Sequence, residues 1–120
     1  FIAMNFANMD MVGHTGNFIA AQKAVSVVDG EMARIIKVLI KNGGQAIVTA
    51  DHGNIEEMIN PDSGEPDTEH STNLVPFILI NSRVPAPHNL PDGQLANVAP
   101  TILKIMGIDK PVEMTAKSLI

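Results

Sequence analysis

Three histidines and two aspartates of this sequence are of the residue types that bind divalent metals. They are Asp10, His14, Asp51, His52 and His70. Asp51 and His52 follow the apolar run 45–49 with only Ala50 between, at the point where a predicted strand gives way to a turn. Asp10 and His14 are four positions apart, so a single helical turn would place both side chains on one face. Carboxylate and imidazole together suit first-row divalent metals such as Mn or Zn, and paired ions of this kind can hold a phosphoryl group.

Each of these residues also has an ordinary structural interpretation. An Asp-His pair in a loop is more often a solvated or helix-capping pair than a metal site, and His70 alone resembles an exposed loop residue. His88 has no metal-ligand type beside it and is expected to be a surface histidine. The five residues favour a metal site because they come from three separate segments, and each segment adjoins an apolar run.

An α/β fold would bring these segments together. The apolar runs 1–7, 45–49 and 75–80 have the length of buried strands, and residues 18–42 carry apolar side chains at helical spacing. Strand, helix and strand in this order predict a βαβ unit, and hence a mostly parallel sheet flanked by helices. Ligand residues would then meet at the carboxyl ends of neighbouring strands, where open α/β sheets place their sites.

The rest of the chain predicts shorter elements. Asn54 is a typical N-cap for a short helix over 54–59, and the polar stretch 60–73 is expected to be a loop that carries His70. The proline-rich stretch 81–92 should be irregular. A final helix is expected over 95–106, followed by a tail docked through its apolar residues.

The composition excludes several functions. Only eight Lys and Arg stand against thirteen Asp and Glu, for a net charge of −5, which argues against nucleic-acid binding. No apolar run approaches the roughly 20 residues of a membrane span, so no membrane partner is expected. The absence of Cys fits a cytoplasmic protein. The chain opens on Phe1 inside an apolar run, which predicts a piece of a longer protein with exposed apolar surface and a tendency to self-associate.

Four sets of residues carry a resemblance to one known family: 5–17, 49–54, 69–73 with 75–77, and 95–101 with 113–120. Together they resemble the cofactor-independent (2,3-bisphosphoglycerate-independent) phosphoglycerate mutases of the alkaline phosphatase superfamily. The element 49–53, Thr-Ala-Asp-His-Gly, is shared across that superfamily. The element 10–16, Asp-Met-Val-Gly-His-Thr-Gly, and the ending 113–120 are more specific to the mutases. The resemblance runs through the whole chain and matches the C-terminal part of the family.

The resemblance implies a two-metal site. It assigns Asp10, His14 and His70 to one divalent ion, and Asp51 and His52 to a second, with manganese the expected metal and other divalents possible. Asn97 stands where the family has Asp, and Ala116 where it has Gly; neither is a ligand.

The same resemblance implies an incomplete alkaline-phosphatase-like domain. Residues 1–120 would be its C-terminal segment, without the N-terminal segment and without the substrate-binding domain. The full-length enzyme would be a cytoplasmic, monomeric isomerase of glycolysis and gluconeogenesis that interconverts 2- and 3-phosphoglycerate through a phosphoserine. The nucleophilic serine would lie outside these residues, so the chain alone is expected to hold no catalytic residue and to be inactive. A metal-dependent phosphate-ester hydrolase of the same superfamily and a non-catalytic metal-binding module are the alternatives.

Overall fold

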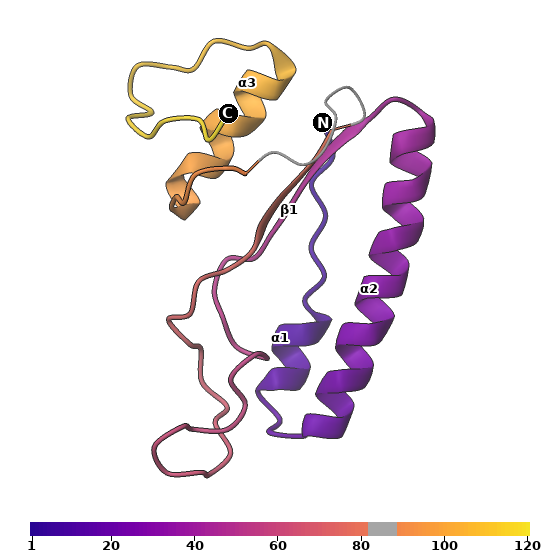
Figure 1. The fold of residues 1–120 in the computed structure, drawn as a ribbon, viewed down its shortest axis with the longest axis vertical. Helices are drawn as coiled ribbons and strands as arrows, with labels where there is room; N and C mark the ends of the chain where they lie inside the picture. Colours follow the sequence, from indigo (N-terminus) through magenta and orange to yellow (C-terminus); the bar gives the residue numbers. More distant parts are fainter. Residues whose placement is uncertain (82–88) are drawn as a thin grey trace. The chain divides into compact units, whose positions relative to one another are not determined.

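A computed structural model describes residues 1–81 and 89–120 of the chain (Figure 1). The chain divides into two compact units, Phe1–Ser82 and Arg83–Ile120, which are described separately. His88 and residues 82–87 of the stretch predicted to be irregular lie outside the described residues. Residues 89–92 of that stretch contain no helix or strand, as predicted.

Two helices open the first unit. Helix α1 spans Asn8–Gly13 and helix α2 spans Phe18–Lys41. The side chain of Asn17 caps α2 by accepting a hydrogen bond from the Ala20 N–H at 3.0 Å. Past the other end, Gly43 adopts a φ of 70°, a left-handed conformation that favours glycine. The helix predicted over 18–42 is confirmed, and the stretch before it contains the helical turn that can put Asp10 and His14 on one face.

The sheet of this unit differs from the predicted one. Strands β1 (Gln45–Thr49) and β2 (Phe77–Asn81) pair antiparallel, with Thr49 opposite Phe77. The chain leaves β1 at Thr49 and returns beside the same residue, so β2 runs back along β1 without a crossover. The strand predicted over 1–7 is absent: these residues form no strand, and the sheet of the described residues consists of β1 and β2. A sheet with flanking helices is therefore present, but its mostly parallel arrangement is not confirmed.

The segment after β1 forms turns instead of the helix predicted over 54–59. Three hydrogen bonds join its backbone to the returning chain: Ser71 N–H to Gly53 O, Asp67 N–H to Met58 O, and Asn60 N–H to Glu65 O, each at 2.9 Å. In an isolated helix these backbone N–H and C=O groups would bond to one another within the segment. Here they bond to the backbone of the returning loop instead. This ladder holds the loop that carries His70 against the turn that carries His52.

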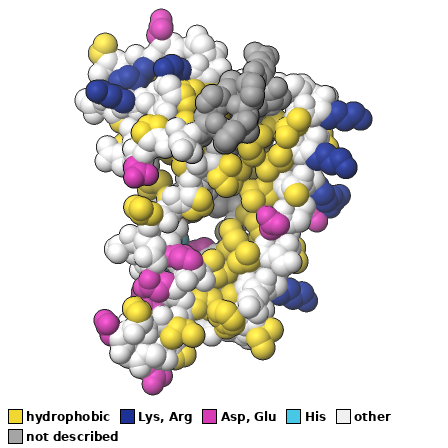
Figure 2. Space-filling view, in the orientation of Figure 1, with side chains coloured by type: hydrophobic (Ala, Val, Ile, Leu, Met, Phe, Trp, Pro, Cys, Tyr) yellow, Lys and Arg dark blue, Asp and Glu magenta, His cyan; other side chains and the backbone are white. Residues whose placement is uncertain are grey.

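The apolar core of the first unit is small. Ala21, Val28 and Met58 are its buried hydrophobic residues, whereas Phe1 and Ile2 are 84% and 81% exposed. In Figure 2 hydrophobic side chains gather on the side of α2 that faces the rest of the unit, and Lys and Arg project from its outer edge. Much apolar surface of this unit is open to solvent. None of the helices in the described part of the chain is long and apolar enough to cross a membrane.

The second unit is a helix with a docked tail. A 3-10 turn over Leu95–Asn97 leads into helix α3, Val98–Met106. Thr101 is fully buried, and its hydroxyl accepts a hydrogen bond from the Leu119 N–H at 3.0 Å. The side chain of Asn97 donates to the Lys117 carbonyl at 2.8 Å. The predicted final helix and docked tail are both present.

Candidate metal centre

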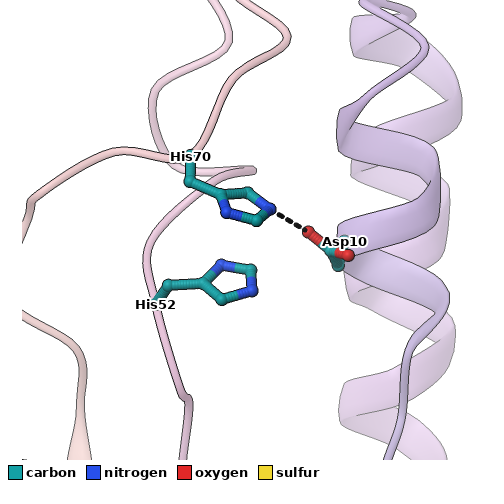
Figure 3. A group of neighbouring side chains, drawn as sticks. All are labelled: Asp10, His52 and His70. Atoms are coloured by element: carbon teal, nitrogen blue, oxygen red, sulfur yellow. Dashed lines mark ion pairs between the residues drawn. The ribbon is translucent and has the colours of Figure 1, made fainter.

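Three segments of the first unit bring metal-ligand types together. Helix α1 carries Asp10, with His14 at its C-terminal end, the turn after β1 carries His52, and the loop before β2 carries His70. Figure 3 shows His52 and His70 side by side, with the His70 ring directed at the Asp10 carboxylate of the neighbouring helix. The long loop between β1 and β2 therefore returns His70 to the end of β1, as the sequence predicted.

Asp10, His14 and His70 form a compact triangle of donor atoms. Asp10 Oδ1 lies 3.3 Å from His14 Nε2 and 3.4 Å from His70 Nε2, and the two nitrogens are 3.2 Å apart. Adjacent ligands bound at about 2.0–2.2 Å to one tetrahedral or octahedral ion lie roughly 2.8–3.6 Å from each other. The three atoms thus have the spacing that a single divalent ion requires, and one carboxylate with two imidazoles is a suitable donor set.

His52 extends this group on its other side. Its ring stacks on the His70 ring, with centroids 3.7 Å apart and an interplanar angle of 21°. Ligand atoms of Asp10, His52 and His70 all lie within 4.8 Å of one another. Two overlapping trios therefore share Asp10 and His70. The trio with His14 has all three of its edges at 3.2–3.4 Å, which suits one ion.

The orientation of the His14 ring leaves one nitrogen free for a metal. His14 Nδ1 lies 2.5 Å from the carbonyl oxygen of Thr68. Because a carbonyl can only accept, the proton of the neutral ring must be on Nδ1, so Nε2 presents its lone pair to Asp10 and His70. A ligating histidine usually donates its second nitrogen to a carbonyl or carboxylate in this way.

Asn54 also belongs to this site, although its sequence position predicted only a helix cap. The residue is 6% exposed, and its Nδ2 donates to Asp10 Oδ1 at 3.1 Å. The same nitrogen lies 3.4 Å from His14 Nε2. Asn54 therefore packs against α1 and orients the Asp10 carboxylate. The only signal in the sequence was its position two residues after His52.

Asp51 stands apart from the cluster. Its side chain is 88% exposed, and its Oδ1 lies 3.7 Å from His52 Nε2. Asp10, His14 and His70 are partly exposed, at 38%, 41% and 49%, so the site is open to solvent. The structure thus brings Asp10, His14, His52 and His70 together and leaves Asp51 at the surface beside His52.

Glu56, a carboxylate near the site, has a lowered pKa. Partial burial raises the pKa of Glu56, but hydrogen bonds from the Ser71 hydroxyl, the Asn54 N–H and the Asn73 side chain outweigh this and lower it from 4.5 to about 2. Donors that point at an ionised carboxylate stabilise the charged form. Glu56 is therefore ionised throughout the neutral range.

The sequence of the chain also matches known proteins. The sequence model of the Metalloenzyme superfamily matches residues 1–110. The chain belongs to the metalloenzyme superfamily. This metalloenzyme chain is 57% identical over 120 residues to the 2,3-bisphosphoglycerate-independent phosphoglycerate mutase 2 of Methanosarcina barkeri, covering 99% of the chain and 22% of that protein. It is 50% identical over 120 residues to the 2,3-bisphosphoglycerate-independent phosphoglycerate mutase of Clostridioides difficile, covering 100% of the chain and 24% of that protein.

A solved structure gives the same relationship for the fold. The metalloenzyme chain superposes on a Leishmania mexicana phosphoglycerate mutase, determined at low cobalt concentration, with a TM-score of 0.80 and 32% sequence identity. The match covers 94% of the chain and 23% of the mutase. The chain therefore has the fold of one part of a phosphoglycerate mutase, and it spans less than a quarter of that enzyme's length.

Proposed function

We propose that this chain is the C-terminal, metal-binding segment of a 2,3-bisphosphoglycerate-independent phosphoglycerate mutase with an alkaline-phosphatase-like fold. The observation that carries the proposal is the triangle of Asp10 Oδ1, His14 Nε2 and His70 Nε2, with edges of 3.2–3.4 Å. Its support from sequence is the 50–57% identity to enzymes named as such mutases. The substrate of the whole enzyme would be a phosphoglycerate, interconverted between its 2- and 3-phospho forms.

The site residues of this chain divide between two divalent ions in the proposal. Asp10, His14 and His70 would hold one, and Asp51 and His52 would supply two ligands of the other. A bound divalent ion supplies positive charge that stabilises a transferring phosphoryl group and favours the ionised form of an attacking hydroxyl. Manganese is the proposed metal, since mixed imidazole and carboxylate ligands suit it among other divalent ions.

The residues of this chain hold the metal ligands in position and do not themselves react. His14 is held by Thr68 with Nε2 toward the site, and Asn54 keeps Asp10 Oδ1 pointing at the two histidines. The serine that would accept the phosphoryl group is assigned to another segment of the enzyme. We accordingly propose that these 120 residues alone do not turn over substrate, and that the full-length enzyme is a cytoplasmic monomer.

The test uses the full-length protein supplied with Mn²⁺. Interconversion of 2- and 3-phosphoglycerate that is lost in a His14→Ala variant would support the proposal. Hydrolysis of phosphate esters without interconversion would instead identify a hydrolase of the same superfamily. Mn²⁺ binding to the 120-residue chain, measured by calorimetry with the same variant as a control, tests the metal site separately from the reaction.

A further inference from the structure

Glu56 is not one of the proposed metal ligands, yet it connects the segments that carry them. Its Oε2 accepts a hydrogen bond from the Asn54 N–H at 2.8 Å. Its Oε1 accepts from the Ser71 hydroxyl and from Asn73 Nδ2, the latter at 3.2 Å. Asn54 follows His52 by two residues, and Ser71 follows His70 directly. One carboxylate therefore joins the turn that carries His52 to the loop that carries His70.

Close packing at Gly53 strengthens this connection. Gly53 is buried, and its carbonyl accepts a hydrogen bond from the Ser71 N–H at 2.9 Å. A Cβ atom at Gly53 would lie 3.2 Å from Glu56 Cδ and would overlap the Ser71 hydroxyl and a Glu56 carboxylate oxygen. Glu56 and Ser71 thus meet over the bare backbone of Gly53, where only glycine leaves room for them.

The connection reaches the third segment through Asn54. Glu56 fixes the backbone of Asn54, and the side chain of Asn54 donates to Asp10 Oδ1 at 3.1 Å on helix α1. The donors that meet Glu56 come from both the segment of His52 and the segment of His70. Hydrogen bonds to an ionised carboxylate are shorter and stronger than those between neutral groups, so this one side chain is well suited to hold the three segments in place.

We propose that Glu56 is a positioning residue of the metal centre, whose carboxylate sets His52 and His70, and through Asn54 also Asp10, in the arrangement a divalent ion requires. The inference rests on the metal site proposed above. Glu56 acts at a distance from the ion, because its two oxygens are already occupied by donors from Asn54, Ser71 and Asn73. Partners that hydrogen-bond a ligand directly commonly change metal affinity about 10- to 100-fold when they are removed. Glu56 acts one contact further out, through Asn54 and Ser71, so we expect an effect at the lower end of that range.

The experiment measures binding of Mn²⁺ alone to the 120-residue chain and to two matched variants. Glu56→Gln keeps the shape of the side chain but leaves one acceptor oxygen, so it cannot accept from Asn54 on one side and from Ser71 and Asn73 on the other. Glu65→Gln makes the same change at an exposed carboxylate that accepts no hydrogen bond from the described residues. Titration calorimetry is carried out where circular dichroism shows all three proteins folded. We expect Glu56→Gln to weaken Mn²⁺ binding by roughly tenfold or more, and Glu65→Gln to leave it unchanged.

A second readout separates positioning from simple loop stability. Long-range ¹H–¹⁵N spectra of the metal-free protein report each histidine ring. Glu56→Gln should shift or broaden the signals of His52 and His70, and Glu65→Gln should not. A residue that only stabilised the loop would lower the unfolding midpoint without changing ring signals or Mn²⁺ affinity in the folded protein.

The possible results distinguish the role of Glu56 from the existence of the metal site. Unchanged affinity in a folded Glu56→Gln protein overturns the role of Glu56 while the metal site stands. Failure of the wild-type chain to bind Mn²⁺ overturns the metal site, and with it this inference. If Glu56→Gln does not fold, Ser71→Ala decides, because it removes one donor and keeps the backbone hydrogen bond to Gly53. A loss of affinity of about fivefold or more, the fold-change that corresponds to the net value of one hydrogen bond, supports the inference, and no loss refutes it.

Discussion

A Cβ atom on Gly13 would overlap the side-chain oxygen of Asn54. The virtual atom lies 2.9 Å from Asn54 Cγ and closer still to Oδ1. Gly13 is the last residue of α1, and Asn54 is buried against it. The missing side chain at position 13 is therefore what lets the amide of Asn54 reach Asp10.

Gly13→Ala should destabilise the first unit for this reason. Overpacking a closed contact costs about 1–3 kcal/mol, and here it also displaces the amide that orients Asp10. Gly30→Ala is the matched control, because Gly30 lies within α2 with no atom within 4 Å of its virtual Cβ. That control should gain about 1 kcal/mol from better helix propensity. Urea unfolding measures both, and equal stability changes of the two variants would contradict the packing argument.

Asn54→Asp should introduce repulsion without changing the shape of the side chain. Its new carboxylate would face Asp10 Oδ1, where Asn54 Nδ2 now donates at 3.1 Å. We expect a loss of about 1–3 kcal/mol near neutral pH, because a hydrogen bond becomes an unpaired contact between like charges. Asn60→Asp is the control, since Asn60 Oδ1 already accepts from the Asp62 and Ser63 N–H groups and an aspartate can do the same. Unfolding of both variants at neutral pH gives the comparison.

Glu56 should add stability that depends on pH. Its pKa is lowered from 4.5 to about 2 in the folded chain. A lowered folded pKa means that the contribution is complete above about pH 5 and is lost as the pH falls toward 2. The stability difference between wild type and Glu56→Gln should therefore be constant from neutral pH to about pH 5 and shrink below it. Urea unfolding across this range measures the difference, in which the other carboxylates cancel; a difference that grows toward low pH would reverse the sign of the argument.

Single ligand variants should rank the residues of the metal centre. His14→Ala and His70→Ala remove corners of the 3.2–3.4 Å triangle and should weaken the first Mn²⁺ ion by more than roughly a hundredfold. Asp51→Ala should leave that first ion unaffected, because the Asp51 side chain is 88% exposed beside His52. Calorimetry provides the affinities. Equal losses in all three variants would place Asp51 on the same ion as His14.

The isolated chain should self-associate through its exposed apolar residues. Phe1 and Ile2 are 84% and 81% exposed, and contiguous apolar surface of this kind favours association. Sedimentation velocity at several concentrations should show a rising mean mass. Ile2→Ser should reduce that rise, and Asn8→Ser, a polar change at an exposed position, should not. A chain that remains monomeric at high concentration would show that this surface is inert.

Local patterns predicted the parts of the structure that depend on local interactions. The helical apolar spacing of 18–42 predicted α2, and the short apolar run Gln45–Thr49 predicted β1, because each pattern depends only on residues within one element. The four-residue spacing of Asp10 and His14 was likewise enough to place them on one helical face. The return of His70 to the end of β1 could be expected from the length of its loop.

Contacts between distant segments could not be predicted in this way. The pairing of β1 with β2 is antiparallel because of how the loop between them returns, and residue spacing does not determine that. The helix expected at Asn54 is replaced by a backbone ladder to residues 65–71, whose hydrogen bonds depend on the partner segment. For the same reason the contacts of Asn54 with Asp10, and of Glu56 with Ser71, had no signal in the sequence.

An ion bound in the triangle of donor atoms would also restrict the unfolded chain. His14 and His70 are 56 residues apart, yet their Nε2 atoms lie 3.2 Å from each other. An ion bound by both would act as a covalent cross-link does, by closing a long loop and reducing the freedom of the unfolded chain, an effect of about 4 kcal/mol for a disulfide spanning a loop of this size. In a unit whose buried hydrophobic residues are Ala21, Val28 and Met58, such a closure would be a major part of what keeps the segments folded together.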